Sequence, residues 1–215
     1  SEIRSVAEES GYSVLVQSMI SMDDRTIYIS LPNIKEAIPA GIVFIALGFS
    51  DPDTIAQFIN MPYDEGRKFI KYILQDSAHI HSKEEALEYI GRYPMYAIPK
   101  EKQDAYARQV VEMELFPHLG VVGTLRDKAS FLGHVINRLI CTVIGVRKDD
   151  DRDNCANKRI ETTGMLLGSL FHSVFDGFLK STTAALTKRC DIMMHVNQNS
   201  YITKSIRHCF STGNW

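Results

Sequence analysis

The sequence predicts a mainly α-helical protein that begins with a small β element. Hydrophobic residues alternate with polar ones within residues 12–31, and from Pro39 onward they recur with a period of about three and a half. Hydrophobic residues make up 45% of the chain and charged residues 23%, a composition that excludes collagen-like and broadly disordered proteins. With 215 residues, the chain can bury a core without disulfides or structural metals, as one large domain or two small ones.

The β element is expected to be a hairpin. Val14 and Val16 alternate with other residues in the first strand, Ile27 and Ile29 do so in the second, and the turn-like run 23–25 lies between them.

Short helices are expected next, each with a start or stop signal. Ser82 forms a capping box with Glu85, and Gly48 is a stop signal. The expected segments are a buried helix at 42–47, a helix capped by Ser50 or Asp51 with Pro52 in its first turn, a helix over about 64–74, a helix after Ser82, and a charged helix from Pro99 to Pro117.

Two longer helices carry wide apolar stripes. Residues 131–144 place apolar residues in adjacent pairs four apart, and residues 167–179 repeat the pattern. We therefore expect these two helices to pack centrally against each other. Leu139→Asp should then cost more than about 4 kcal/mol by burying a charge.

The charge balance limits any nucleic-acid role to local sites. Lys and Arg number 24 against 26 Asp and Glu, for a net charge of −2. The last forty residues carry five positive and two negative charges, so they contribute +3 and residues 1–175 contribute −5. A basic face on an acidic body suits a protein that lines a nucleic-acid channel, although such asymmetry alone decides nothing.

The cysteines and the chain start favour an intracellular piece of a longer protein. The four cysteines form no Cys-x-x-Cys pair, which favours buried reduced thiols. The longest uncharged stretches are too short to cross a bilayer, there is no Asn-x-Ser/Thr sequon, and the first residue is not Met.

The familiar nucleotide-binding, zinc-protease and serine-hydrolase motifs are absent, so a stand-alone enzyme has little support. His134 and His172 lie on polar flanks of apolar helices, where surface histidines are more common than metal ligands.

The most polar run of the chain is residues 147–154, followed by Lys158 and Arg159. Its aspartates could hold Mg²⁺ in a metal-dependent nuclease. Five positive charges balance four negative ones, which fits equally a solvated loop with internal ion pairs or a positioned interaction site.

The same run, continued to Gly164-Met165-Leu166-Leu167, closely resembles a signature of the second-largest, β-like subunit of multisubunit DNA-directed RNA polymerases. Other segments match that family in the same order: 32–35, 38–39, 42–44, 46–48, 100–102, 116–119, 128–129, 131–133, 136–139 and 212–215. The resemblance is closest to the eukaryotic-type subunit and covers nearly the whole chain.

The resemblance implies a helical polymerase lobe over residues 37–215, preceded in residues 1–36 by strands that continue from the adjoining protrusion domain. The chain departs from the family pattern at four positions. Asn154 stands where the family usually has His, Cys155 where it has Phe or Leu, and Ala156 where it has Gly; Ile45 replaces a common Arg. Divergence of this degree suggests a large DNA virus as the source, with a diverged cellular lineage as the alternative.

The resemblance also implies the function. The fragment should be catalytically inert, hold no cofactor or metal, and form one wall of the DNA cleft; the Mg²⁺ of the parent nucleotidyltransferase is bound elsewhere. Its partners would be other polymerase subunits, an initiation factor of the TFIIF type, a small zinc-ribbon subunit, and DNA bound weakly without sequence preference. No association with a membrane is expected.

Nucleic-acid contacts would come, by motif position, from Asp153 and Arg159, with Arg152 and Lys158 as their neighbours. The guanidinium, ammonium and carboxylate groups of these residues suit phosphates and base edges. Lys188 and Arg189 are further candidates for DNA contact. The location would be the nucleus for a cellular enzyme, or the host cytoplasm or virion for a viral one. The alternative function is a free-standing helical adaptor that binds only protein.

Overall fold

A computed structural model describes residues 1–7, 13–21, 25–120, 123–151, 153–158, 160–187, 193 and 200–214. The chain divides into two compact units, Ser1–Asp150 and Asp151–Trp215, and each is described by itself. The domain boundary predicted after residue 36 stays a prediction. No helix in the described ranges is long and apolar enough to cross a membrane.

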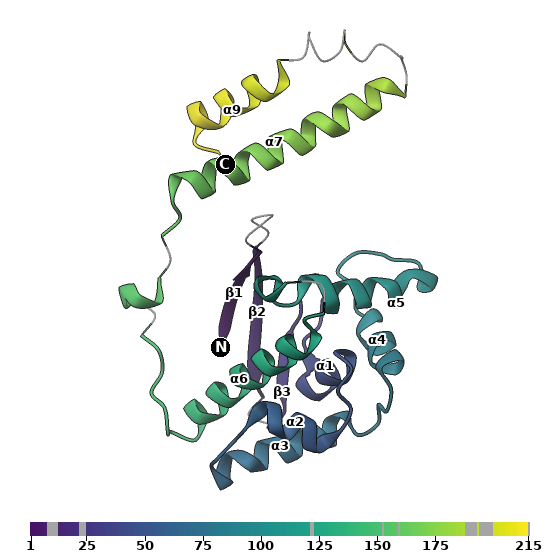
Figure 1. The fold of residues 1–215 in the computed structure, drawn as a ribbon, viewed down its shortest axis with the longest axis vertical. Helices are drawn as coiled ribbons and strands as arrows, with labels where there is room; N and C mark the ends of the chain where they lie inside the picture. Colours follow the sequence, from purple (N-terminus) through teal and green to yellow (C-terminus); the bar gives the residue numbers. More distant parts are fainter. Residues whose placement is uncertain are drawn as a thin grey trace. The chain divides into compact units, whose positions relative to one another are not determined.

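The first unit begins with an antiparallel sheet in the order β1-β2-β3-β4, formed by β1 (Glu2–Val6), β2 (Ser13–Ile20), β3 (Ile27–Ser30) and β4 (Ile38–Pro39) (Figure 1). The predicted hairpin is confirmed as β2 and β3, with Gln17 opposite Ser30. Val14 and Val16 are buried on one face, while Leu15 on the other face is 51% exposed. The turn residues Asp23 and Asp24 lie outside the described residues.

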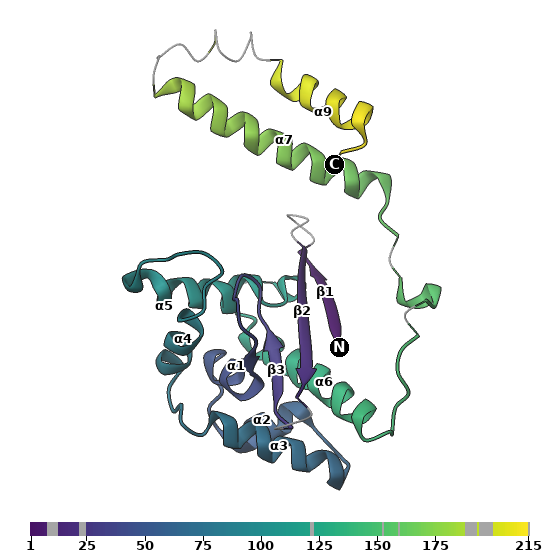
Figure 2. The same cartoon turned by 180° about the vertical axis from the view of Figure 1, so that it is seen from behind.

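Helix α1 (Ala40–Ala46) is the centre of the core, because all seven of its residues are buried. It contacts β3 and β4 on one side and α3 and α4 on others (Figures 1 and 2). Gly48 ends this segment with a φ of 98°, a conformation that glycine adopts without strain. Ile45, where the family commonly has Arg, is 3% exposed and therefore belongs to the core.

The surrounding helices are α2 (Pro52–Ile59), α3 (Asp64–Ser77), α4 (Lys83–Gly91), α5 (Lys100–Gln109) and α6 (Leu125–Val143). Their predicted caps are present: Asp51 accepts from the Thr54 amide at 2.9 Å, and Ser82 accepts from the Glu85 amide at 3.2 Å. A π-helical turn (Val110–Glu114) and a 3-10 turn (Pro117–Leu119) connect α5 to α6.

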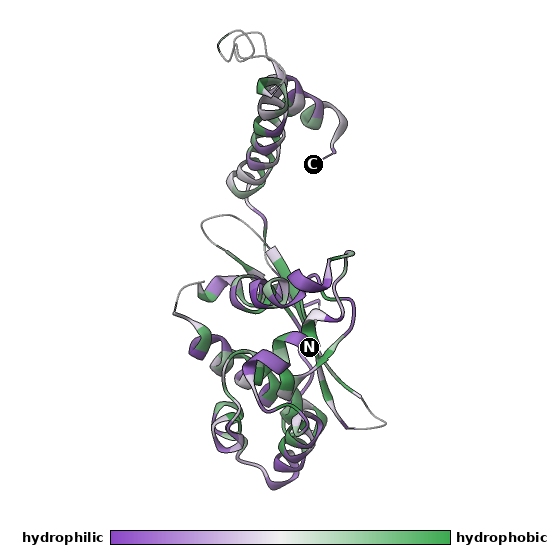
Figure 3. Cartoon of the chain, turned by 90° about the vertical axis from the view of Figure 1, so that its right-hand side faces the viewer, coloured by the Kyte–Doolittle hydropathy of each residue, from purple (hydrophilic) through white to green (hydrophobic). Residues whose placement is uncertain are grey.

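The described part of the second unit holds a 3-10 turn (Cys155–Asn157), α7 (Thr163–Leu186) and α9 (Tyr201–Thr212), with α7 packed on α9. Hydrophobic residues recur along α7 (Figure 3). Leu170 and Val174 are its buried residues, whereas Phe171 is 48% exposed.

The mainly helical fold class is thus confirmed, but the stripe of α6 is already covered by α2 within the first unit, which differs from the expected central pairing of the two striped helices. Helix α6 packs against α2, and α7 packs against α9. Leu139 is partly buried rather than fully enclosed, and Phe171 is exposed. Both stripes exist as predicted, so the difference concerns which helix covers which stripe.

Candidate functional site

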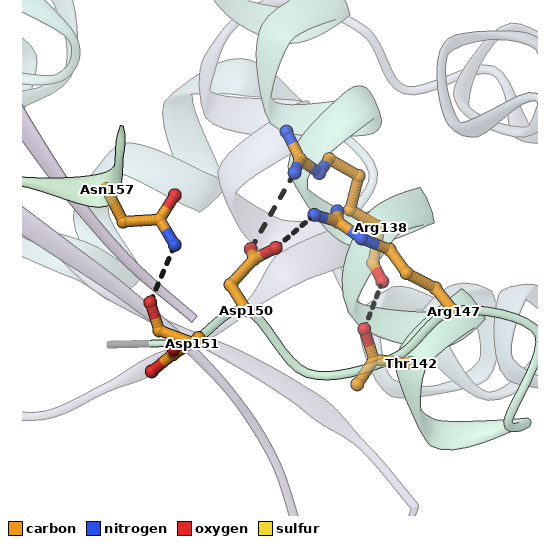
Figure 4. A network of polar contacts seen from close by, with 6 residues as sticks. All are labelled: Arg138, Thr142, Arg147, Asp150, Asp151 and Asn157. Carbon is orange, nitrogen blue, oxygen red and sulfur yellow. Dashed lines mark hydrogen bonds and ion pairs between the residues drawn. The ribbon is translucent and has the colours of Figure 1, made fainter. Parts of the chain in front are cut away.

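The polar loop after α6 begins with an ion-pair cluster around Asp150 (Figure 4). Its carboxylate accepts from Arg147 at 2.5 Å and lies 3.7 Å from a terminal nitrogen of Arg138, which comes from α6. The Arg147 amide also donates to the Cys141 carbonyl at 3.1 Å. These contacts, all within the first unit, fix the start of the loop on the end of α6.

The continuation of the loop, in the second unit, has its own contacts. Asp151 accepts from the Asp153 amide at 3.0 Å with its carboxylate and from the Asn157 side chain at 2.7 Å with its carbonyl. Asn154 accepts from the Ala156 amide at 3.0 Å and so caps the 3-10 turn. The departure from the family's His at position 154 therefore has a local structural role.

The predicted contact residues are partly described. Lys158 and Asp153 lie 3.8 Å apart, with side chains 57% and 93% exposed. Arg152 and Arg159, like Lys188 and Arg189, lie outside the described residues. The internal ion pairs expected from the balanced charges are present, while the nucleic-acid role of these residues stays a prediction.

The aspartates do not converge in the described ranges, which contain no group of three or more His, Cys, Asp or Glu side chains that could hold a metal ion. Cys141, Cys155 and Cys209 are free thiols. Cys141 and Cys209 are half-buried and Cys155 is exposed, so the expectation that the thiols are buried is met only in part at the first two and is wrong at Cys155. Its place in a surface loop explains the difference.

A second polar region was not singled out from the sequence. A hollow of about 390 Å³ lies where α2 and α6 cross. Its polar lining residues are Gln57 of α2, Asn60 at the end of α2, and Ser130, His134 and Asn137 of α6. The available signal was a polar residue every fourth position of α6, at 126, 130, 134 and 138.

Residues 2–161 match the family described as RNA polymerase Rpb2, domain 2. The chain belongs to this family, the lobe of the RNA polymerase second-largest subunit. The match to relatives extends beyond residue 161, because one of them aligns with 100% of this chain, including α7 and α9.

Three relatives illustrate the range. The chain is 32% identical to the DNA-directed RNA polymerase II subunit RPB2 of Encephalitozoon cuniculi over 100% of its length and 20% of that protein. It is 33% identical to RNA polymerase II subunit 2 of Arabidopsis thaliana, over 86% of this chain and 16% of the relative. It is 33% identical to Rpo2 of Sulfolobus acidocaldarius, over 93% and 18%.

The lobe chain thus spans about a fifth of the length of the curated relatives it matches. These relatives come from eukaryotes and an archaeon, and the viral source stays a prediction.

Proposed function

We propose that this chain forms one wall of the DNA cleft of a multisubunit RNA polymerase, near the downstream duplex and the displaced non-template strand. The observation that carries the proposal is the match of residues 2–161 to domain 2 of Rpb2. In this proposal the chain contributes architecture, and the nucleotidyl transfer and its Mg²⁺ belong to other parts of the assembly.

The partners follow from the same membership. We propose contacts with other RNA polymerase subunits, since the relatives carry that name, and docking of an initiation factor of the TFIIF type and a small zinc-ribbon subunit. The location proposed is that of the polymerase: the nucleus of a cell, or the host cytoplasm or virion for a virus.

The loop is proposed to contact nucleic acid through Lys158 and Asp153 together with Arg152 and Arg159. The separation of 3.8 Å and high exposure make the Lys158–Asp153 pair a weak one. Lys158 can therefore exchange this carboxylate for a phosphate at little cost. With a net charge of −2 and few local cations, we expect the chain alone to bind DNA with a dissociation constant of about 10⁻⁴ to 10⁻⁶ M or weaker.

The test is Arg159→Ala in the polymerase that contains this chain. We expect a shorter lifetime of the open promoter complex and an unchanged melting temperature of the 215-residue chain. Arg108→Ala is the matched control, because Arg108 is exposed at the end of α5. A large fall in melting temperature with no change in promoter lifetime would show that Arg159 is a structural partner of the loop aspartates and would refute the contact.

A further inference from the structure

Two hollows flank the carboxyl-terminal half of α2, and together we name them the α2 groove. One, of about 390 Å³, lies between α2 and α6, and the other, of about 550 Å³, lies between α2 and α3. Gln57 and Asn60 line both, so the two hollows adjoin. Each has the size of a ligand-binding site.

The floor of the groove is held rigidly. A Cβ atom on Gly133 would lie 2.3 Å from the Phe58 carbonyl oxygen, so α6 and α2 cross in direct backbone contact. Asn137 donates to the carbonyls of Ile59 at 2.9 Å and Asn60 at 3.0 Å, which satisfies the end of α2. The positions of the groove side chains are therefore fixed by a helix crossing rather than by a loop.

Several hydrogen-bonding groups around the groove are available to a ligand. The side chains of Gln57, Ser130, His134 and Lys71 are exposed and have no hydrogen-bond or ion-pair partner among the residues that the structure describes. They contribute an amide, a hydroxyl, an imidazole and an ammonium. All four can donate to an oxygen-rich ligand.

The charges around the groove favour an anion. Arg67 and Lys71 line the second hollow against one carboxylate, Asp53. Arg67 pairs with Asp64 at 3.2 Å, but both side chains are exposed at 58% and 93%, so this pair is weak. On α6, the exposed Arg126 continues the row of Ser130 and His134, with steps of about 6 Å along the helix axis.

We propose that the α2 groove binds the sugar–phosphate backbone of a nucleic-acid strand. Phosphate contacts in proteins come from Arg, Lys, Ser, Asn and Gln side chains, which are the residue types present here. Protein-docking surfaces instead centre on aromatic and apolar anchors, and the aromatic ring here, Phe58, is partly buried. The absence of an exposed stacking ring among the lining residues predicts binding without base preference.

This site uses none of the loop residues, so it extends the proposed function and can be tested separately from it. The 215-residue chain is titrated against a fluorescein-labelled oligothymidylate of about twenty nucleotides, and anisotropy is measured over a range of salt concentrations. Lys71→Ala should weaken binding several-fold and reduce the magnitude of the salt slope by about 0.7, the loss of one phosphate contact on a single strand. Asp53→Asn should strengthen binding, because it removes the carboxylate from the hollow.

Matched controls are Lys102→Ala and Asp104→Asn, which make the same charge changes on the exposed side of α5, a helix that packs on α4. If these controls change binding as much as the groove variants, net charge alone governs binding and the site is refuted. If Lys158→Ala abolishes binding and both groove variants match the unmodified chain, the loop is the contact and the groove is not. If polyglutamate of similar charge competes as well as the oligonucleotide, the groove is a general anion surface and the assignment to nucleic acid is wrong.

Discussion

A buried lysine gives the sharpest test of the energetics of this fold. Lys128 lies in the first turns of α6 with a fully buried side chain, and its Nζ donates to the Glu112 carbonyl of the π-helical turn at 2.7 Å. The carboxylate of Glu112 pairs with Lys83 at 3.0 Å. One residue of the π-helical turn therefore joins α4 to α6, and the cost of that arrangement is a buried ammonium group.

The cost can be expressed as a pH dependence. Burial lowers the pKa of Lys128 from 10.5 to about 8, and the Glu112 carboxylate offsets part of this effect. Between these two values the unfolded chain binds more protons than the folded chain, so the free energy of unfolding rises with pH. The full shift corresponds to about 3 kcal/mol, of which roughly 2 kcal/mol should be gained between about pH 7 and pH 9.5.

The perturbation is Lys128→Met, which keeps the chain length and removes the titrating group. At neutral pH the variant loses a hydrogen bond to a buried carbonyl, which lowers the free energy of unfolding by about 1–3 kcal/mol. It also loses a buried charge of similar cost, so the net change in the free energy of unfolding is small. At about pH 9.5 the unmodified protein has gained its roughly 2 kcal/mol and the variant has not.

Urea unfolding at the two pH values measures the difference. Burial also raises the pKa of the Tyr89 phenol, but this group is present in both proteins and its effect cancels. Lys102→Met, at an exposed position, should retain the pH dependence of the unmodified protein. Parallel stability curves for Lys128→Met and the unmodified protein would refute the reasoning.

Three further predictions concern packing, and each is checked by the free energy of unfolding or the melting temperature. Gly133→Ala forces α6 away from the Phe58 carbonyl and should cost about 2–4 kcal/mol, whereas Gly168→Ala, with open space around its position in α7, should stabilise by about 0.5–1 kcal/mol. Ile136→Asp buries a charge at a fully enclosed position and should cost more than about 4 kcal/mol, a larger loss than at the partly buried Leu139. The fragment 1–150 should keep a cooperative melting transition by circular dichroism, while 151–215 alone should show none; equal cooperativity in both would contradict this.

Local signals made most of the first unit predictable. The caps at Asp51 and Ser82 and the stop at Gly48 act within one turn of chain, and the structure has all three. Strand β4 was missed because its two residues are too few to show a pattern, and β1 was missed because it carries charged residues at positions 2 and 4; each is held by pairing with a neighbouring strand. Helix α6 begins at Leu125, before the predicted residue 131. Its first turns were missed because they carry charged residues, one of which, Lys128, is buried.

Long-range features were not predictable in the same way. The Arg147–Asp150 pair spans three residues and follows from the charge pattern of the loop. The α2 groove depends on an Asn137–Ile59 contact that spans 78 residues and on a glycine that allows two backbones to touch. The apolar stripes of α6 and α7 are similar, so the sequence does not specify which helix packs against each of them. The packing of α6 on α2 is visible only in the tertiary structure.

The distribution of buried residues explains the different expectations for the two units. In the second unit, Leu170 and Val174 are the buried apolar residues in the described part, and the rings of Phe171 and Phe175 stack at 5.7 Å while remaining 48% and 37% exposed. With so little burial among its described residues, we expect this unit alone not to offset the conformational entropy lost on folding. The match to domain 2 also ends at residue 161, before α7 begins. Stability of the chain therefore resides in residues 1–150, where the sheet, α1 and α6 share one core.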